Sequence, residues 1–181
     1  MPGDPLYEQF TSEGDRIVID AHDDALGMKI RRRRHSTRVF DAKMIPLGQV
    51  RIDDDRVEQR SLDGTQRTSA EWIDDDTAHM PDAWRIERTD NGWDIFDADA
   101  TVIALLRRSE DQWTLRPTRG DVVTLTTSTD GGTDLVVDGQ GHMVLNTRAD
   151  RLSSVSLLIL AIDELDPLHR YSLATFADLH F

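Results

Sequence analysis

Apolar and polar residues alternate in short runs along most of the chain. The segments AWRIER (83–88), DQWTLRP (111–117) and DVVTLTT (121–127) alternate in this way, which is typical of half-buried β-strands. Turn-forming sequences such as TDNG, TRGD and STDGG lie between the runs, as expected where strands reverse. The pattern predicts about twelve or thirteen short strands before residue 150, at the regular spacing of an all-β barrel or sandwich.

Five segments share one arrangement, in which an apolar run reaches an aspartate and a second run follows about three residues later. An aspartate side chain binds backbone N–H groups just ahead of it and so fixes a chain reversal. Each segment therefore predicts a β-hairpin, and its aspartate is interpreted as a turn residue rather than a catalytic one. The segments are 16–30, 37–52, 59–72, 92–108 and 133–148, with turn residues Asp20, Asp41, Asp63, Asp97 and Asp138.

The pattern changes in DRLSSVSLLILAIDEL, which begins at Asp150. Asp150 is a suitable helix N-cap, Pro167 follows the expected helix end, and the residues from Val155 to Ile162 leave no polar stripe,. A strand is the alternative, but the Leu-rich composition and the length favour a helix over about residues 150–165. A helix that is apolar on every side must be surrounded by protein.

Together these elements predict a mainly β fold, a closed antiparallel barrel of about twelve strands around a central hydrophobic C-terminal helix. A barrel of this width is too wide for its own side chains to fill, and a helix can occupy the space. We expect residues 1–181 to form a single domain of this kind,. An interfacial membrane anchor is the alternative role of the helix, but the acidic residues Asp163, Glu164 and Asp166 disfavour it,.

The composition limits the classes of function. The formal net charge is -13, which repels nucleic acid at long range, so we expect no nucleic-acid partner. The chain has no cysteine, which excludes disulfides, thiol catalysis and cysteine-ligated metals. No apolar run approaches the ~20 residues that span a bilayer, and the N-terminus does not resemble a signal peptide. We therefore expect a cytoplasmic protein, with a peripheral position at the inner membrane face if it binds lipid.

One segment departs from the acidic composition. KIRRRRHSTR, from Lys29 to Arg38, contains six of the 21 basic residues. Arginine binds phosphate oxygens in a two-point fashion, so this segment is a candidate site for an anionic lipid head group or another phosphorylated ligand. The alternative is a strand end and loop whose arginines pair with neighbouring aspartates. The candidate ligand-binding residues are Lys29, Arg31, Arg32, Arg33, Arg34 and Arg38.

Other residues are weaker candidates for a metal site or a catalytic site. His22 lies among carboxylates in DAHDD (20–24) and could join a metal site, but a hairpin turn explains the same residues. The acidic runs 53–55 and 74–76 lack the ligand spacing of a calcium loop,. No phosphate-binding loop, dinucleotide fingerprint or nucleophile motif occurs,. We predict no catalytic residue, no metal site and no cofactor. The four tryptophans are interpreted as core or girdle residues, and they are Trp72, Trp84, Trp93 and Trp113.

Four segments carry a family resemblance, namely GWDIFDADATVIALLRR (92–108), DQWTLRP (111–117), TDLVVDGQGHMVLNTR (133–148) and DRLSSVSLLILAID (150–163). They resemble the tubby C-terminal-like superfamily, and within it the LURP-one-related and phospholipid-scramblase-like branch. The resemblance implies a closed twelve-stranded barrel around a hydrophobic helix, and a binding or scaffold module rather than an enzyme. The glycine that the family places three residues after the turn aspartate occurs here only as Gly141, and the equivalent positions hold Asp23, Met44, Gln66 and Ala100.

The sequence leaves several functions open. One is a non-enzymatic tubby-like barrel that binds an anionic ligand such as a phospholipid head group, and the other is an intracellular scaffold that binds a protein partner. A metal-dependent hydrolase that uses His22 is a weaker third hypothesis, since only one histidine lies among the carboxylates of residues 20–24,.

Overall fold

The structure is a computed structural model that describes residues 28–32, 36–110, 112–127, 133–137, 140–144 and 153–181. Within these residues the fold is mainly β, with antiparallel sheets and two helices near the C-terminus. The predicted turn residues Asp20 and Asp138 and the candidate metal ligand His22 lie outside the described residues. Of the two described helices, neither has the length and apolar content that crossing a bilayer requires.

Two antiparallel meanders make up the β structure, because consecutive strands pair with each other everywhere except between β5 and β6. The smaller sheet contains β1 (Met28–Arg32), β2 (Ser36–Asp41), β3 (Pro46–Asp53), β4 (Arg56–Arg60) and β5 (Arg67–Ser69). The larger sheet contains β6 (Glu71–Trp72), β7 (Thr77–Met80), β8 (Trp84–Thr89), β9 (Gly92–Asp97), β10 (Val102–Ser109), β11 (Gln112–Pro117), β12 (Val123–Thr127), β13 (Thr133–Val137) and β14 (Gln140–Val144).

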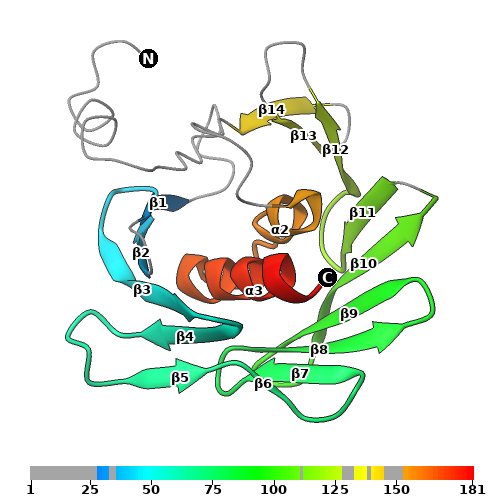
Figure 1. The fold of residues 1–181 in the computed structure, drawn as a ribbon. Coiled ribbons are helices and arrows are strands. Elements are labelled where there is room, and N and C mark those ends of the chain that lie inside the picture. The colour runs from blue at the N-terminus through cyan, green and yellow to red at the C-terminus, as the bar shows by residue number, and fades with distance from the viewer. Residues whose placement is uncertain (1–27, 33–35, 111, 128–132, 138–139, 145–152) are drawn as a thin grey trace, which may run out of the picture.

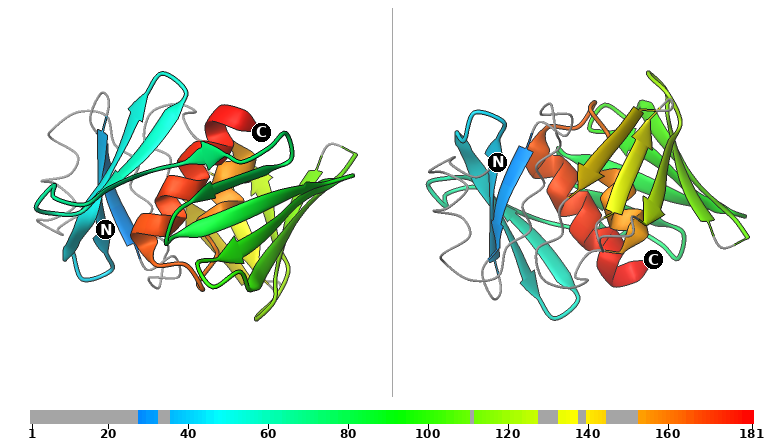
Figure 2. Two further views of the ribbon diagram at one scale, coloured as in Figure 1. Left: turned by 90° about the horizontal axis from the view of Figure 1, so that it is seen from below. Right: turned by 90° about the horizontal axis from the view of Figure 1, so that it is seen from above.

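The two sheets curve around the C-terminal helices, α2 (Ser154–Ile159) and α3 (Pro167–His180) (Figure 1). Two further views show α3 running between the sheets (Figure 2). Only Ala70 separates β5 from β6, and its N–H bonds to the carbonyl of Val57 at 2.9 Å. The chain therefore passes from one sheet to the other within a single residue.

The predicted closed barrel of twelve strands is not found. Fourteen strands form sheets of five and nine, and within the described residues β1, β5, β6 and β14 are edges that pair with one neighbour each. Two helices rather than one fill the interior, so the sheets pack on helical surfaces and need not hydrogen-bond to each other all the way round,.

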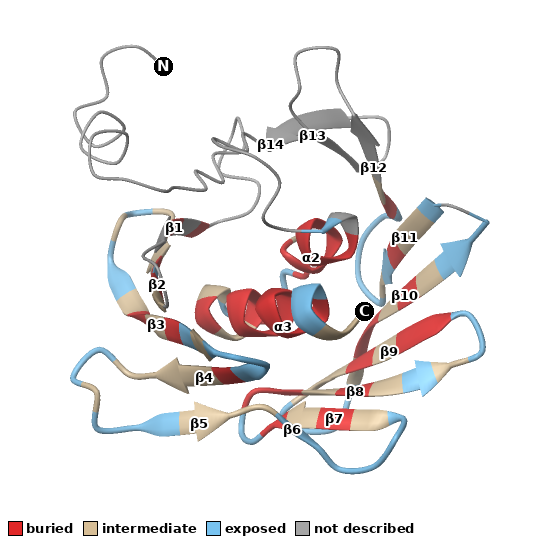
Figure 3. Cartoon of the chain, in the orientation of Figure 1, coloured by how far each residue is buried: buried red, intermediate tan, exposed pale blue. Residues whose placement is uncertain are grey.

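The predicted helix over residues 150–165 is wrong in extent but right in burial. Helix α2 has six residues, Ser154–Ile159, and Ser153 is its N-cap. Its apolar side chains are buried, as are the next large ones up to Ile162 (Figure 3). The prediction that this apolar run is shielded from water is confirmed.

The longer helix begins where the sequence predicts a helix end. Asp166 is the N-cap of α3 and accepts a 3.0 Å hydrogen bond from the N–H of His169, while Pro167 occupies the first turn. Proline disfavours helical backbone at the residue before it, but its fixed φ suits the start of a helix. Pro167 therefore separates the two helices and starts the second one, which has 14 residues.

Helix α3 is buried although it contains polar residues. Ser172 Oγ accepts a 2.9 Å hydrogen bond from Trp84 Nε1 on β8, which ties the helix to the larger sheet. Tyr171 Oη donates a 3.3 Å hydrogen bond to Thr37 Oγ1 on β2, which ties it to the smaller sheet. These contacts satisfy polar groups that would otherwise be costly to bury. The helix therefore connects both sheets through specific hydrogen bonds.

The predicted aspartate turns are confirmed at the described positions. Asp41 Oδ1 accepts hydrogen bonds from the N–H groups of Lys43 and Ile45, each at 2.9 Å. Asp97 Oδ1 accepts equivalent bonds from Asp99 and Thr101, at 3.0 and 2.9 Å. Both loops connect adjacent antiparallel strands, β2 to β3 and β9 to β10. The short polar side chain thus sets the reversal locally, as the sequence pattern indicates.

Candidate functional site

The predicted basic site is only partly within the described residues. Arg31 on β1 pairs directly with Arg38 on β2, and Arg38 is exposed. Lys29 pairs with Phe40, and Arg32 pairs with the buried Thr37. Arg33 and Arg34 lie outside the described residues. The hairpin therefore brings Arg31 and Arg38 to opposite positions, and this is as much of the site as the described backbone assembles.

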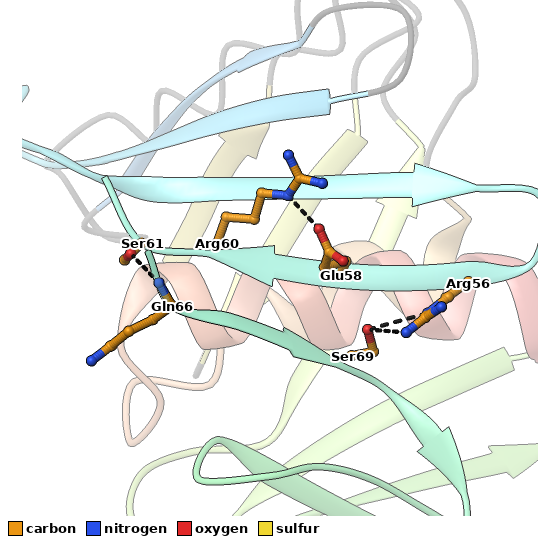
Figure 4. A network of polar contacts seen from close by, with 6 residues as sticks. All are labelled: Arg56, Glu58, Arg60, Ser61, Gln66 and Ser69. Carbon is orange, nitrogen blue, oxygen red and sulfur yellow. Dashed lines mark hydrogen bonds and ion pairs between the residues drawn. The ribbon is translucent and has the colours of Figure 1, made fainter. Parts of the chain in front are cut away.

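Several other arginines bind neighbouring groups on the protein surface, and two of them pair with a carboxylate. On the outer face of β4 and β5, Arg60 pairs with Glu58, and Arg56 donates two hydrogen bonds to Ser69 Oγ at 3.2 and 3.0 Å (Figure 4). Arg107 Nη2 lies 2.5 Å from Asp94 Oδ1. These contacts agree with the alternative interpretation of the basic residues, in which arginines bind neighbouring groups on the protein surface.

A pocket of about 310 Å³ lies beside the end of α3, where the β8–β9 turn meets β10 and β11. We call it the rim pocket. Among the residues that line it are Arg88, Asn91, Trp93, Arg108, Trp113 and Phe181. Its volume is at the small end of the range of about 300–1,000 Å³ for ligand pockets.

The two arginines of the rim pocket are exposed near the ends of their strands, on the strand faces whose earlier residues are buried. Side chains alternate between the faces of a strand, and Trp84 and Ile86 on β8 are both buried. Arg88 is the next residue on that face. Leu106 on β10 is buried, and Arg108 follows it with the same spacing. Both strand faces therefore pass from buried apolar residues to an exposed arginine at the rim of the sheet.

Each of these arginines lies over a tryptophan ring on the adjacent strand. Arg88 is paired in register with Trp93, and its guanidinium carbon is 4.9 Å from the centre of the ring. Arg108 is paired with Trp113, and the same distance is 5.9 Å. Both distances fall within the range of about 6 Å for a cation–π contact. The ring faces therefore hold the two positive charges at the pocket.

The guanidinium groups are oriented by contacts through Nε. Arg88 Nε lies 3.6 Å from a carboxylate oxygen of Asp76, and Arg108 Nε donates a 3.3 Å hydrogen bond to the carbonyl of Glu110. Within the described residues, the terminal nitrogens of both side chains have no hydrogen-bond partner. Since these nitrogens form the two-point fork that binds carboxylate or phosphate, the pocket presents two oriented anion-binding groups.

Aromatic side chains form the apolar part of the pocket. Trp93 is only 5% exposed and its ring stacks on that of Phe181, with centres 4.3 Å apart and planes 4° apart. Trp113 is half-buried, and among the described residues its only ring contact is with Arg108. In the pocket, Trp93 therefore stacks on another ring, whereas Trp113 packs against the core and carries Arg108 over its ring.

Other polar groups modify the pocket. Asp90 is exposed on the β8–β9 turn and adds a negative charge to the lining. Thr89 Oγ1 is buried and has no hydrogen-bond partner in the described part of the chain. His180 Nε2 lies 3.2 Å from the backbone carbonyl of Asp55, so this contact does not pair the imidazole with a nucleophile.

A metal site is not assembled in the part of the chain that the structure describes. No three histidine, aspartate or glutamate side chains gather there in the way that a metal ion requires. The acidic run Asp74–Asp76 is exposed, and the N–H of Asp76 donates to the carboxylate of Asp74 at 2.9 Å. The run is therefore a turn at the strand end, as the sequence indicates.

Sequence reasoning missed the rim pocket, although a signal for it exists. Trp93 and Trp113 are interpreted from the sequence as core or girdle residues, and Arg88 and Arg108 are not singled out. The signal is the period of two in Trp84, Ile86, Arg88 and in Leu106, Arg108, which places each arginine on an apolar face.

No family model matches this chain, and neither a curated protein nor a solved structure is significantly similar to it. The tubby-like resemblance therefore stays an expectation from the sequence.

Proposed function

We propose that this protein is a non-enzymatic, tubby-like β module that binds a small anionic ligand in the rim pocket. The mainly β fold around buried C-terminal helices supports the kinship, since the resemblance implies both features. The observation that carries the function is the pair Arg88 and Arg108. Each is exposed at the end of a strand, lies over a tryptophan ring and leaves its terminal nitrogens without a partner among the described residues.

The net charge of -13 makes two arginines without a carboxylate-bound fork a local exception to the acidic surface of this chain. In an acidic chain arginines can be neutralised on the surface, as Arg60 is by Glu58 and Arg107 is by Asp94. Two cations at the mouth of a pocket attract anions at short range, although Asp76 and Asp90 offset part of their charge,.

Isothermal titration calorimetry with two anions of different shape tests this function. The probes are myo-inositol 1,4,5-trisphosphate and 2-naphthoate. We expect at least one to bind, and we expect Arg88→Gln and Arg108→Gln each to weaken that binding by about tenfold or more. Arg116→Gln, an exposed change on β11, is the matched control and leaves binding unchanged. Absence of binding by both probes contradicts the proposal, and so does binding that neither pocket variant weakens.

A second candidate is an anionic lipid head-group site in Lys29–Arg38, which the direct pairing of Arg31 with Arg38 supports. Juxtaposed arginines attract anionic head groups more strongly than isolated ones. Co-sedimentation with phosphatidylserine vesicles and with neutral phosphatidylcholine vesicles tests it. We expect anionic vesicles alone to bind, and Arg31→Ser together with Arg38→Ser to abolish the binding. If the vesicles and both soluble probes fail, the scaffold hypothesis becomes the better account.

A further inference from the structure

A row of basic residues crosses the smaller sheet from β1 to β5. In the strand register Arg31 is opposite Arg38, and Arg38 is opposite Gln49. Gln49 is in turn opposite Arg60, and Arg60 is opposite Arg67. Since neighbouring strands lie about 4.8 Å apart, the row extends over about 19 Å. We call these five positions the arginine row.

The arginine row lies on the outer face of the sheet. Side chains alternate between the two faces of a strand, and Thr37 and Val39, which flank Arg38 on β2, are both buried. Arg38 and Arg67 are exposed, and Arg60 is partly exposed. A partner in solution can therefore reach the row from β2 to β5.

The positive charge of the row is only partly balanced within the protein. Arg60 pairs with Glu58 on the same strand (Figure 4). Neither Arg38 nor Arg67 forms an ion pair with another described residue. The row itself contains no carboxylate, because its central member is Gln49. In a chain of net charge -13, the row is a line of positive charge on an acidic protein.

The next row along the strands does not extend this charge. Arg51 is opposite Ser36 on one side and Glu58 on the other, and Glu58 is opposite Ser69. Asp53, two residues beyond Arg51 on β3, is exposed. A flat anionic bilayer on this face also meets these carboxylates, whereas an extended chain that follows the arginine row does not. The face therefore fits a linear anion better than a charged surface.

The chemistry of the row favours carboxylates of a polypeptide over a nucleic acid. None of its five members is aromatic, whereas proteins that bind single-stranded nucleic acid add aromatic stacking to their cations. Guanidinium groups bind carboxylates in a two-point fashion. A length of about 19 Å corresponds to about six residues of an extended chain, at about 3.3 Å per residue.

We infer that the arginine row is a docking site for an extended acidic segment of a partner protein, whose carboxylates bind the arginines across the strands. This inference goes beyond the proposed function, because no residue of the row lines the rim pocket. The contacts are charge-assisted and largely exposed to solvent, so the binding weakens as the salt concentration rises.

Calorimetric titration with two peptides tests the docking. Acetylated octaglutamate amide carries the negative charge along an extended chain, and the matched control of the same length alternates glutamate with lysine. We expect octaglutamate to bind at least about tenfold more tightly than the control, and to lose affinity between 50 and 200 mM salt. Equal affinity for the two peptides, or no binding of octaglutamate, overturns the inference.

Substitutions at the centre of the row test its position. We expect Gln49→Glu to weaken octaglutamate binding by about tenfold, and Gln49→Arg to strengthen it by about threefold or more. Gln112→Glu on β11, which is exposed on the larger sheet, makes the same charge change away from the row and should have little effect. Thermal melting reports whether each variant is folded, and either Gln49 variant suffices if the other unfolds. Equal effects of Gln49→Glu and Gln112→Glu overturn the site.

Two further arginine variants separate the row from the rest of the face. We expect Arg38→Gln together with Arg67→Gln to reduce octaglutamate binding at least about tenfold, and Arg51→Gln, outside the row but exposed on the same sheet, to change it by less than about threefold. A loss in Arg51→Gln as large as that in the double variant contradicts recognition by the row.

Other classes of partner are distinguished in the same titration. Phosphatidylserine vesicles and an oligothymidylate of eight nucleotides are the probes. Tighter binding of either one than of octaglutamate overturns the acidic segment, and for the vesicles it favours the lipid site, which shares Arg31 and Arg38. The rim pocket is tested separately, since inositol trisphosphate binding that Arg88→Gln weakens does not depend on the row.

Discussion

Trp84 Nε1 donates a 2.9 Å hydrogen bond to Ser172 Oγ at the buried centre of the protein, although the two residues are 88 positions apart. The same hydroxyl donates a 2.7 Å hydrogen bond to the carbonyl of His169 one turn earlier in α3. The indole is 1% exposed and Ser172 is fully buried. The bond therefore fixes the rotation of α3 relative to the sheet that forms the rim pocket.

We expect Ser172→Ala to lower the free energy of unfolding by about 1–3 kcal/mol, because it leaves the buried indole N–H without an acceptor. Chemical denaturation measures the loss. In a double-mutant cycle with Trp84→Phe, we expect the combined loss to be smaller than the sum of the single losses. Additive losses would show that the two side chains do not interact.

Burial lowers the pKa of the Arg170 guanidinium, while Asp163, Asp166 and Glu164 act in the opposite direction. Its Nη1 donates to the carbonyl of Leu160 at 3.1 Å and its Nη2 to that of Leu165 at 3.0 Å. The side chain therefore supplies donors to carbonyls beyond the end of α2, where the helix itself has none.

We expect Arg170→Met, which keeps the length of the side chain, to lower the free energy of unfolding by about 2–4 kcal/mol, because two buried carbonyls lose their donors. Arg116→Met on the exposed face of β11 is the control and should change stability by less than about 0.5 kcal/mol. Equal small effects of both changes in chemical denaturation would contradict this role of Arg170.

The turns after Asp41 and Asp97 place non-glycine residues in the left-handed region. Met44 has φ 65° and Ala100 has φ 62°, and each lies three residues after its turn aspartate. This is the position at which the resembling family has glycine, and a positive φ is the physical reason for that preference. We expect Ala100→Gly to raise the free energy of unfolding by up to about 1 kcal/mol, because it removes a left-handed strain of ~1–2 kcal/mol that the entropy of glycine partly offsets.

Ala98→Gly in the same turn is the matched control. Ala98 does not have a positive φ, so glycine only adds entropy to the unfolded chain there and should destabilise by about 0.5–1 kcal/mol. Thermal melting of both variants decides the matter, and a loss of stability in Ala100→Gly as large as that in Ala98→Gly would contradict the prediction.

Asp63 is the titratable turn residue with the clearest shift. Hydrogen bonds from Ser61 and from the backbone and side chain of Thr65 lower the pKa of its carboxyl from 3.8 to about 2. Because the pKa is lower in the folded state, the stabilisation is complete above the unfolded value near 4 and is lost as the pH falls towards 2. We expect carbon-detected NMR titration to give a pKa of about 2, and Ser61→Ala to raise it. A value near 4 in the native protein would contradict the turn geometry.

Local chemistry explains which parts of the fold could be predicted from the sequence. The turns at Asp41, Asp63 and Asp97 were predictable because the side chain bonds to backbone a few residues away. The strand β8 was predictable from the alternation in residues 83–88. The split into two sheets falls between β5 and β6, which follow each other in the chain but do not pair, and the alternation of residues does not record where pairing stops.

Helix α3 shows why the interior could not be predicted correctly. Its buried residues include Arg170, Ser172 and Thr175, so its sequence lacks the apolar pattern that predicts a core helix. Those polar groups are tolerated because distant partners satisfy them, as Trp84 satisfies Ser172,. The apolar run around Ile159 was predictable as buried because it needs no partner of that kind.

The candidate site was predictable only where charge is concentrated in sequence. The run from Lys29 to Arg38 is visible as a local anomaly in an acidic chain. The rim pocket joins Arg88, Arg108 and Trp113 from three strands with the end of α3. Its residues come together only through the register of β8 to β11, which the sequence does not specify.

Two-dimensional NMR of the arginine Nε–H and indole Nε1–H groups during a titration with 2-naphthoate is the most direct test of ligand binding at the rim pocket. The account predicts saturable shifts for Arg88, Arg108 and Trp113, with Arg116 unchanged. Shifts confined to Arg31 and Arg38, or none at any of these groups, would contradict it.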